Sequence, residues 1–103
     1  MKDTRQDDRK IDSAAEEAFW REQYKREPYY SEDRGFESWA PAYRVGYEGR
    51  MRYGDTPFDE LDSVLQQDYL RLQGNDMSWD EVRPATRAAW ERVDRRVQNL
   101  TGN

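Results

Sequence analysis

The chain of 103 residues contains no cysteine and no histidine. Without cysteine it can form no disulfide bond, thiolate nucleophile or cysteine-based zinc site. Without histidine it lacks the commonest general base, proton shuttle and metal ligand of proteins. We therefore expect a protein that is not an enzyme and that uses no cofactor and no metal.

Long apolar segments are also missing. No window approaches the ~18 apolar residues that a membrane-spanning helix needs. The first residues are charged and contain no apolar stretch of the kind found in a signal peptide. Together with the absence of cysteine, these features predict a soluble, cytoplasmic protein without a membrane span.

Aliphatic residues are scarce, since Leu, Ile, Val and Phe together number only fourteen. That is below the ~20% level associated with disorder, but disorder also requires a high net charge, and the net charge here is −5. Seven Tyr and four Trp add large apolar surfaces. We predict a mobile charged arm over residues 1–12 and a single folded domain over residues 13–100.

Apolar residues at three- and four-residue spacing, bounded by Pro and Gly, predict an all-α fold. Short connections favour an antiparallel bundle or two packed helical hairpins. The four expected helices run from Ser13 to Pro28, from near Ser38 to Gly54, from Thr56 to Gly74, and from Ser78 toward Leu100.

Three of these starts carry capping patterns. Ser13 with Glu16, and Ser78 with Glu81, match the capping box, in which each side chain bonds to the other residue's backbone amide. Thr56 precedes a proline and is expected to cap the third helix with its hydroxyl.

The second and fourth helices contain residues that disfavour a helix. Pro41 is expected to lie in the first turn of the second helix, where backbone amides have no partner within the helix. Gly46 and Gly49 weaken that helix and would let a neighbouring helix approach closely. Pro84 should bend the last helix or delay its start.

Ten of the fourteen aromatic residues lie between residues 19 and 53, interleaved with arginines. This stretch can be a core or a binding surface. Helix spacing assigns five of its aromatic residues to the core: Phe19, Phe36, Trp39, Tyr43 and Tyr47. The others remain candidates for partner binding, because Tyr and Arg dominate interface hot spots. These candidates are Tyr29, Tyr30, Arg44, Arg50, Arg52 and Tyr53.

Two classes of function fit this composition. The first is an interaction module that binds a protein partner or a second copy of itself. The second is a nucleic-acid or ribosome-associated protein, or an acidic mimic of nucleic acid. The pI of about 4.8 disfavours general binding to phosphate backbones, and residues 54–103 carry ten acids against six arginines.

Several fragments of the chain combine into one longer pattern: Phe19-Trp20-Arg21, Pro28-Tyr29, Ala40-Pro41-Ala42-Tyr43-Arg44 and Ala89-Trp90. Over residues 19–96 this pattern resembles a family of small uncharacterised bacterial proteins with a Trp-Arg, Pro-Tyr, Ala-Pro-Ala-Tyr-Arg and Ala-Trp signature. The resemblance implies an association with bacterial stress and supplies no catalytic or cofactor residues.

Overall fold

The computed structural model describes residues 12–54, 56–72 and 76–101. Within these ranges the chain forms four α-helices and one short 3-10 helix, without a β-strand, which confirms the predicted all-α fold. The elements are α2 (Ser13–Gln23), η1 (Tyr24–Arg26), α3 (Phe36–Tyr53), α4 (Phe58–Arg71) and α5 (Trp79–Thr101).

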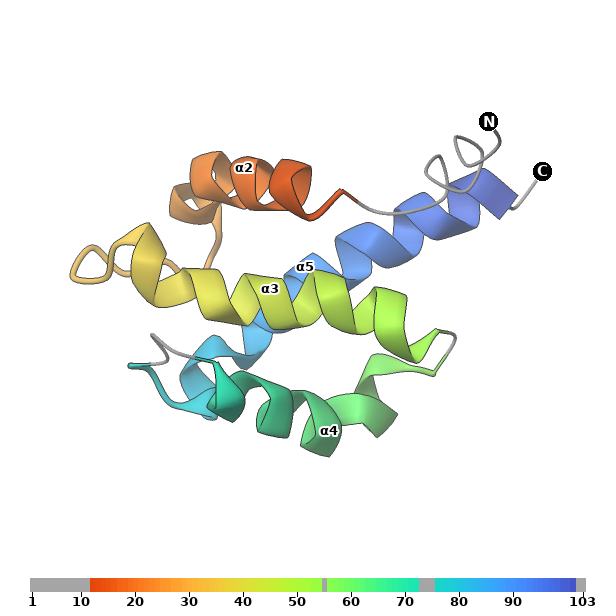
Figure 1. Ribbon diagram of the computed structural model, residues 1–103. Helices are drawn as coiled ribbons and strands as arrows, with labels where there is room; N and C mark the ends of the chain where they lie inside the picture. The colour runs from red at the N-terminus through yellow and green to blue at the C-terminus, as the bar shows by residue number, and fades with distance from the viewer. Residues whose placement is uncertain (1–11, 55, 73–75, 102–103) are drawn as a thin grey trace.

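Helix α3 is the centre of the arrangement (Figure 1). Helix α2 lies along one side of α3, α4 lies along the other, and α5 crosses behind it. The most extensive contact is between α3 and α5, followed by the contact between α2 and α3. Segments from both ends of the chain therefore pack on one central helix.

The two predicted capping boxes have different outcomes. At the start of α5 the box is confirmed, because the Ser78 amide donates to Glu81 Oε1 (2.9 Å) and the Glu81 amide donates to Ser78 Oγ (3.2 Å). At the start of α2 it is wrong. Asp12 Oδ1 instead accepts hydrogen bonds from the backbone amides of Ala14 and Ala15, and Glu16 turns into the protein interior. Apart from Asp12, the predicted arm lies outside the described residues.

Two other helix starts also differ from expectation. Helix α4 begins at Phe58 after Pro57, so Thr56 does not cap it, and no side chain bonds to its first amides. Helix α3 begins at Phe36, which places Pro41 in its second turn. Burial of the Phe36 ring favours this earlier start because it brings an aromatic residue into the core.

The end of α3 and the start of α5 are closer to the predictions. Gly54 ends α3 with a φ of 65°, a conformation that favours glycine. Helix α5 begins at Trp79 and continues through Pro84, so the proline does not delay its start. The predicted stop at Gly74 lies outside the described residues.

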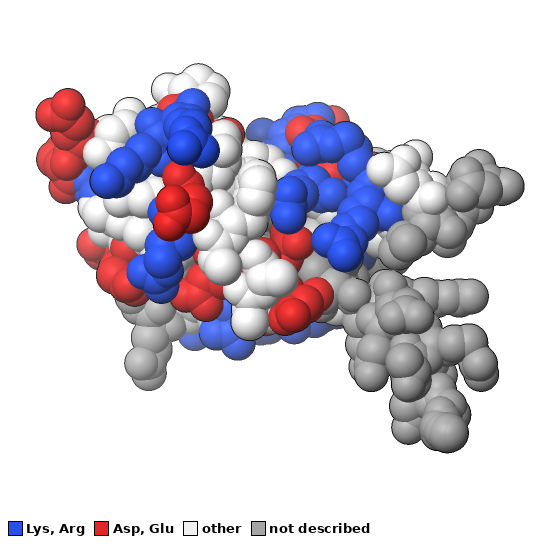
Figure 2. Space-filling view, turned by 90° about the horizontal axis from the view of Figure 1, so that it is seen from above, with Lys and Arg blue, Asp and Glu red and all other residues white. Residues whose placement is uncertain are grey.

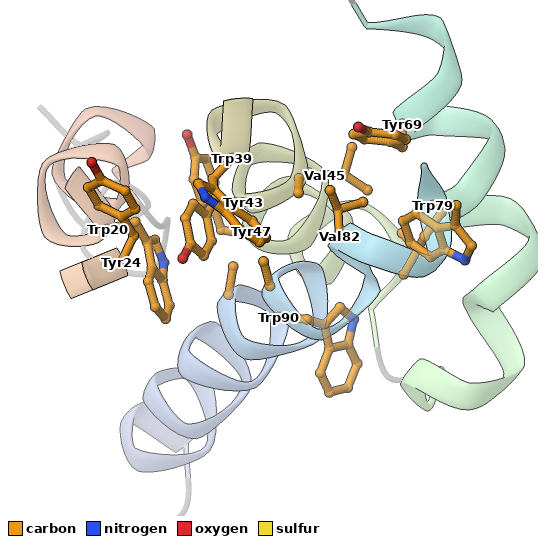
Figure 3. Close-up of a cluster of buried hydrophobic side chains, with 14 of the residues drawn as sticks. Trp20, Tyr24, Trp39, Tyr43, Val45, Tyr47, Tyr69, Trp79, Val82 and Trp90 are labelled. Carbon is orange, nitrogen blue, oxygen red and sulfur yellow. The ribbon is translucent and has the colours of Figure 1, made fainter. Parts of the chain in front are cut away.

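The core is built mainly from aromatic rings (Figure 3). Trp20 on α2 stacks on Tyr43 of α3, with 4.5 Å between ring centroids and 10° between planes. Of the five aromatic residues assigned to the core, Phe36, Trp39, Tyr43 and Tyr47 are buried, which confirms their assignment. Phe19 is only half-buried: it packs against the edge of the core, and a guanidinium group lies over its ring, with Arg92 Cζ 3.6 Å from the ring centroid.

Small residues bring α3 and α5 together. A Cβ atom added at Gly46 would meet the backbone carbonyl oxygen of Thr86 and would lie 2.8 Å from Ala89 Cβ. Thr86 Oγ1 in turn donates a hydrogen bond of 3.0 Å to the carbonyl oxygen of Ala42. The expected close approach at Gly46 is confirmed.

Charged side chains link the helices to one another. Glu16, which is 1% exposed, accepts a 3.0 Å hydrogen bond from Arg92 Nε and so links α2 to α5. On α4, Asp62 accepts hydrogen bonds from Arg83 and from the indole nitrogen of Trp79.

No helix of the described ranges is long and apolar enough to cross a membrane.

Candidate functional site

The six candidate partner-binding residues occupy separate parts of the structure. Tyr29 and Tyr30 follow η1, whereas the remaining four are spread along α3. They therefore do not form one continuous surface, and each group must be assessed from its own contacts.

The two tyrosines after η1 are half-buried at the edge of the core. The hydroxyl groups of Tyr29 and Tyr43 share a 2.8 Å hydrogen bond, and the Tyr29 ring lies 5.2 Å from the Trp39 ring. The rings of Tyr30 and Tyr24 meet in a T-shaped arrangement with 5.6 Å between their centroids. Burial raises the pKa of Tyr29 and of Tyr43 well above the usual range, because an ionised phenolate would lose its hydration there.

Arg50 is internal. Its Nε donates to Asp94 Oδ1 (2.9 Å) on α5, one terminal nitrogen donates to the carbonyl oxygen of Gly54 (2.7 Å), and its guanidinium lies 5.6 Å from the Trp90 ring. With 7% of its side chain exposed, Arg50 joins the end of α3 to α5 and offers little surface to a partner.

Arg44 and Arg52 are accessible, with 57% of each side chain exposed. Arg44 pairs with Glu48 at 3.1 Å, and Arg52 lies 3.5 Å from Asp68 on α4. The half-buried Tyr53 beside them donates a 2.7 Å hydrogen bond to the same carboxylate of Asp68.

Met51 lies on the same face of α3 as these arginines. Met51 continues the four-residue spacing of Tyr43 and Tyr47, a spacing that indicates the core face, but 41% of it is exposed. Arg44, Glu48, Met51 and Arg52 follow each other at helical spacing, and we call this set the α3 surface. An open hollow of about 460 Å³ beside it is lined by Ser13, Glu48, Met51 and Arg52.

Met51 and Glu48 are the members of this surface that were not among the candidate residues. Position 51 continues the four-residue spacing from Tyr47, and such spacing does not show where a neighbouring helix stops covering the face. In the structure this face of α3 is no longer covered at residue 51. The partner-binding candidates that reach solvent on α3 are thus joined by an exposed methionine.

Basic side chains gather in separate groups on the face of the molecule shown in Figure 2. Arg95 and Arg96, in the C-terminal half of α5, are both exposed, and neither makes an ion pair within the described part of the chain. This local positive charge contrasts with the net charge of −5 for the whole chain.

The fold and the exposed residues define a small all-α protein with an aromatic core and an arginine-bearing helical surface. No family model, no curated protein and no solved structure matches this chain. In the described ranges no group of three or more His, Cys, Asp or Glu side chains is placed to hold a metal ion.

Proposed function

We propose that this protein is a non-enzymatic interaction module that binds a protein partner, or a second copy of itself, through the α3 surface. The observation that supports this most directly is the exposure of Met51 between two accessible arginines, Arg44 and Arg52. Methionine and arginine are enriched at protein interfaces. The family resemblance supports a role of this binding under stress.

The energetics of the surface agree with a binding role. The ion pairs of Arg44 and Arg52 are exposed, and such pairs contribute only ~0–1 kcal/mol to stability. The protein therefore gains little from holding these side chains where they are. A partner could re-pair both guanidinium groups at small cost and bury the Met51 thioether in the same contact.

Site-specific photo-crosslinking tests this proposal. A photoreactive amino acid is placed at position 51 and, as a matched control, at Val64 on α4, which is 39% exposed. We expect a defined adduct from position 51 and none of the same mass from position 64. An adduct formed by the purified protein alone identifies self-association, whereas an adduct formed only in cell extract identifies another protein.

Neutralising the two arginines completes the test. Arg44→Gln with Arg52→Gln should remove the adduct while the melting temperature changes little, because exposed ion pairs contribute little to stability. Arg71→Gln, at a residue that is 74% exposed on α4, is the control and should leave the adduct unchanged. Identical adducts from positions 51 and 64, or none from either, would contradict the proposal.

Association with nucleic acid or the ribosome is the second candidate function. The exposed arginines Arg95 and Arg96, which make no ion pair with another described residue, favour it, since arginine binds phosphate groups well. Binding of this kind must weaken steeply as salt rises, because counterions are released from the nucleic acid. We expect a mobility shift with RNA or DNA at low salt that Arg95→Gln with Arg96→Gln abolishes. The absence of a shift at low salt excludes this function.

A further inference from the structure

A second cavity, of about 220 Å³, lies where the segment after η1 meets the first turns of α3 and α5. This volume is far more than one water molecule requires and less than the ~300–1,000 Å³ of pockets for drug-sized ligands. The occupant that fits is a small molecule. The lining residues used below are Tyr29, Asp33, Arg34, Trp39, Met77 and Glu81.

Arg34 brings a positive charge to this cavity. Its guanidinium forms two long ion pairs, 4.0 Å from Asp76 and 3.8 Å from Glu81, and neither distance is short enough for a hydrogen bond. Within the described residues this guanidinium donates no hydrogen bond, and 30% of the side chain is exposed. Arginine carries five N–H donors and binds carboxylates through two of them at once. Arg34 is therefore available to a carboxylate that enters the cavity.

Two carboxylates line the same cavity. Asp33 accepts a hydrogen bond from the Ser31 hydroxyl, and Glu81 accepts one from the Ser78 amide. Each carboxylate retains lone pairs for a further donor. Their negative charges oppose the entry of a simple anion, and they attract an ammonium group. The cavity thus presents both signs of charge within a small volume.

Apart from Ser31, the remaining lining residues are aromatic or carry a thioether, and two of them are almost fully buried. Trp39 and Met77 are 2% and 6% exposed, and the ring of Tyr29 lies 5.2 Å from that of Trp39. Aromatic faces and a thioether accept an apolar side chain, and aromatic faces also attract cations. The indole nitrogen of Trp39 is buried without a hydrogen-bond partner in the described residues.

We propose that this cavity binds a small zwitterion of the α-amino acid class. The carboxylate of the ligand pairs with Arg34, and its ammonium group faces Asp33 and Glu81. Its side chain lies against Trp39 and Met77. A zwitterion pairs with both the positive and the negative groups of the cavity. A ligand with a single charge pairs with the groups of one sign and is repelled by those of the other.

The test compares L-leucine with the two compounds that each lack one of its charged groups. 4-Methylpentanoate retains the carboxylate and the side chain, and 3-methylbutylamine retains the amine and the side chain. Binding is followed by nuclear magnetic resonance through the indole N–H signals, with the Trp39 signal assigned from Trp39→Phe. We expect L-leucine to shift the Trp39 signal and to bind about tenfold or more tightly than either half-molecule.

Variants show where the ligand binds. Arg34→Gln should weaken L-leucine binding by about tenfold, and Asp33→Asn should weaken it less because Asp33 is exposed. Arg71→Gln on α4 is the matched control and should bind as the parent protein does. Circular dichroism confirms that each variant remains folded.

Three results would overturn this inference. The first is no shift of the Trp39 signal with L-leucine or L-alanine at millimolar concentration. The second is equal binding of L-leucine and 4-methylpentanoate, which would indicate a simple anion site. The third is unchanged affinity in Arg34→Gln. None of these results depends on the α3 surface, so this inference and the proposed function can fail separately.

Discussion

Helix α3 is held by α2 and by α5 in two different ways. Against α2 the contact is made by large rings, with Trp20 stacked on Tyr43 at 4.5 Å. Against α5 it is made by small residues, since Gly46 leaves no room for a Cβ atom beside Thr86. A ring contact covers much area with few residues, whereas a small-residue contact depends on how closely two backbones approach.

The comparison shows how a chain with few aliphatic residues builds a core. Each large aromatic side chain can bury ~150–250 Å², so a few rings replace many leucines at the α2 contact. At the α5 contact a hydrogen bond from Thr86 Oγ1 to the Ala42 carbonyl oxygen adds to the close packing. The two contacts should therefore respond differently to a lost ring, a lost charge and an added methyl group.

Removal of the stacked ring should have the largest effect. Trp20 is 4% exposed, and Trp20→Ala should lower the free energy of unfolding by about 3–5 kcal/mol, measured by urea denaturation. Trp20→Phe is the control that keeps a ring at this position, and it should lose clearly less. A loss below ~1 kcal/mol for Trp20→Ala would show that the ring contact is not the main attachment of α2.

Breaking the buried ion pair should have the next largest effect. Arg92→Met leaves Glu16, which is 1% exposed, without its partner, so we expect a loss of roughly 3 kcal/mol in the same measurement. The double variant Glu16→Met with Arg92→Met should recover most of this loss, because it removes the buried charge as well. If the double variant is as unstable as the single one, the pair contributes by packing rather than by charge.

Substitution by alanine should have different effects at the two glycines of α3. Gly46→Ala should destabilise the protein by about 1–3 kcal/mol, because the new Cβ meets the backbone of α5. Gly49→Ala is the matched control, since its Cβ would approach side chains rather than backbone, most closely Cδ2 of Leu65 (2.7 Å), the end of a side chain. It also gains up to ~1 kcal/mol of helix propensity. Equal effects at both positions would mean that the α3–α5 contact is not limited by backbone approach.

Alkaline pH should destabilise the protein through its buried tyrosines. Burial raises the pKa of Tyr47 from 10.0 to about 12, so the folded protein keeps a proton that the unfolded chain has lost. Stability is therefore unaffected below pH ~10 and falls between pH ~10 and ~12, by roughly 1–2 kcal/mol for this residue. Tyr47→Phe should reduce the fall, measured by denaturation at a series of pH values. If stability falls equally in Tyr47→Phe, other groups cause the fall.

The smallest effect is expected at the edge of the ring contact. Tyr29→Phe removes the 2.8 Å hydrogen bond to the Tyr43 hydroxyl and should cost about 1 kcal/mol. Thermal denaturation measures this change, and Tyr30→Phe serves as the control, because the structure gives its hydroxyl no hydrogen bond among the described residues. A larger loss in Tyr30→Phe than in Tyr29→Phe would contradict a stabilising role of the hydrogen bond between Tyr29 and Tyr43.

Much of the fold was predictable because it depends on short-range features. The capping box of Ser78 and Glu81 joins residues three apart, and it is found at the start of α5. The glycine that ends α3 and the close approach at Gly46 were also foreseen. Ser13 and Glu16 match the same capping pattern, yet Glu16 bonds to Arg92 instead. A local pattern cannot show that a distant partner competes for the same carboxylate.

The candidate site was predictable only in part. Residue types identified Arg44 and Arg52, which are exposed, but they equally indicated Arg50, which is buried against Asp94 and Trp90. Met51 was missed because it continues the spacing of a core residue. The cavity at Arg34 was not foreseen either, since its lining comes from three separate segments of the chain.

Composition and local sequence patterns establish that this protein is helical and that aromatic rings must supply its core. These properties follow from composition and from hydrogen bonds between residues close in the chain. Which charged residues are internal and which face solvent depends on the packing of the helices. The ion pairs that bury Arg50 and Glu16 join residues 44 and 76 positions apart, and they depend on how the helices pack rather than on either local sequence.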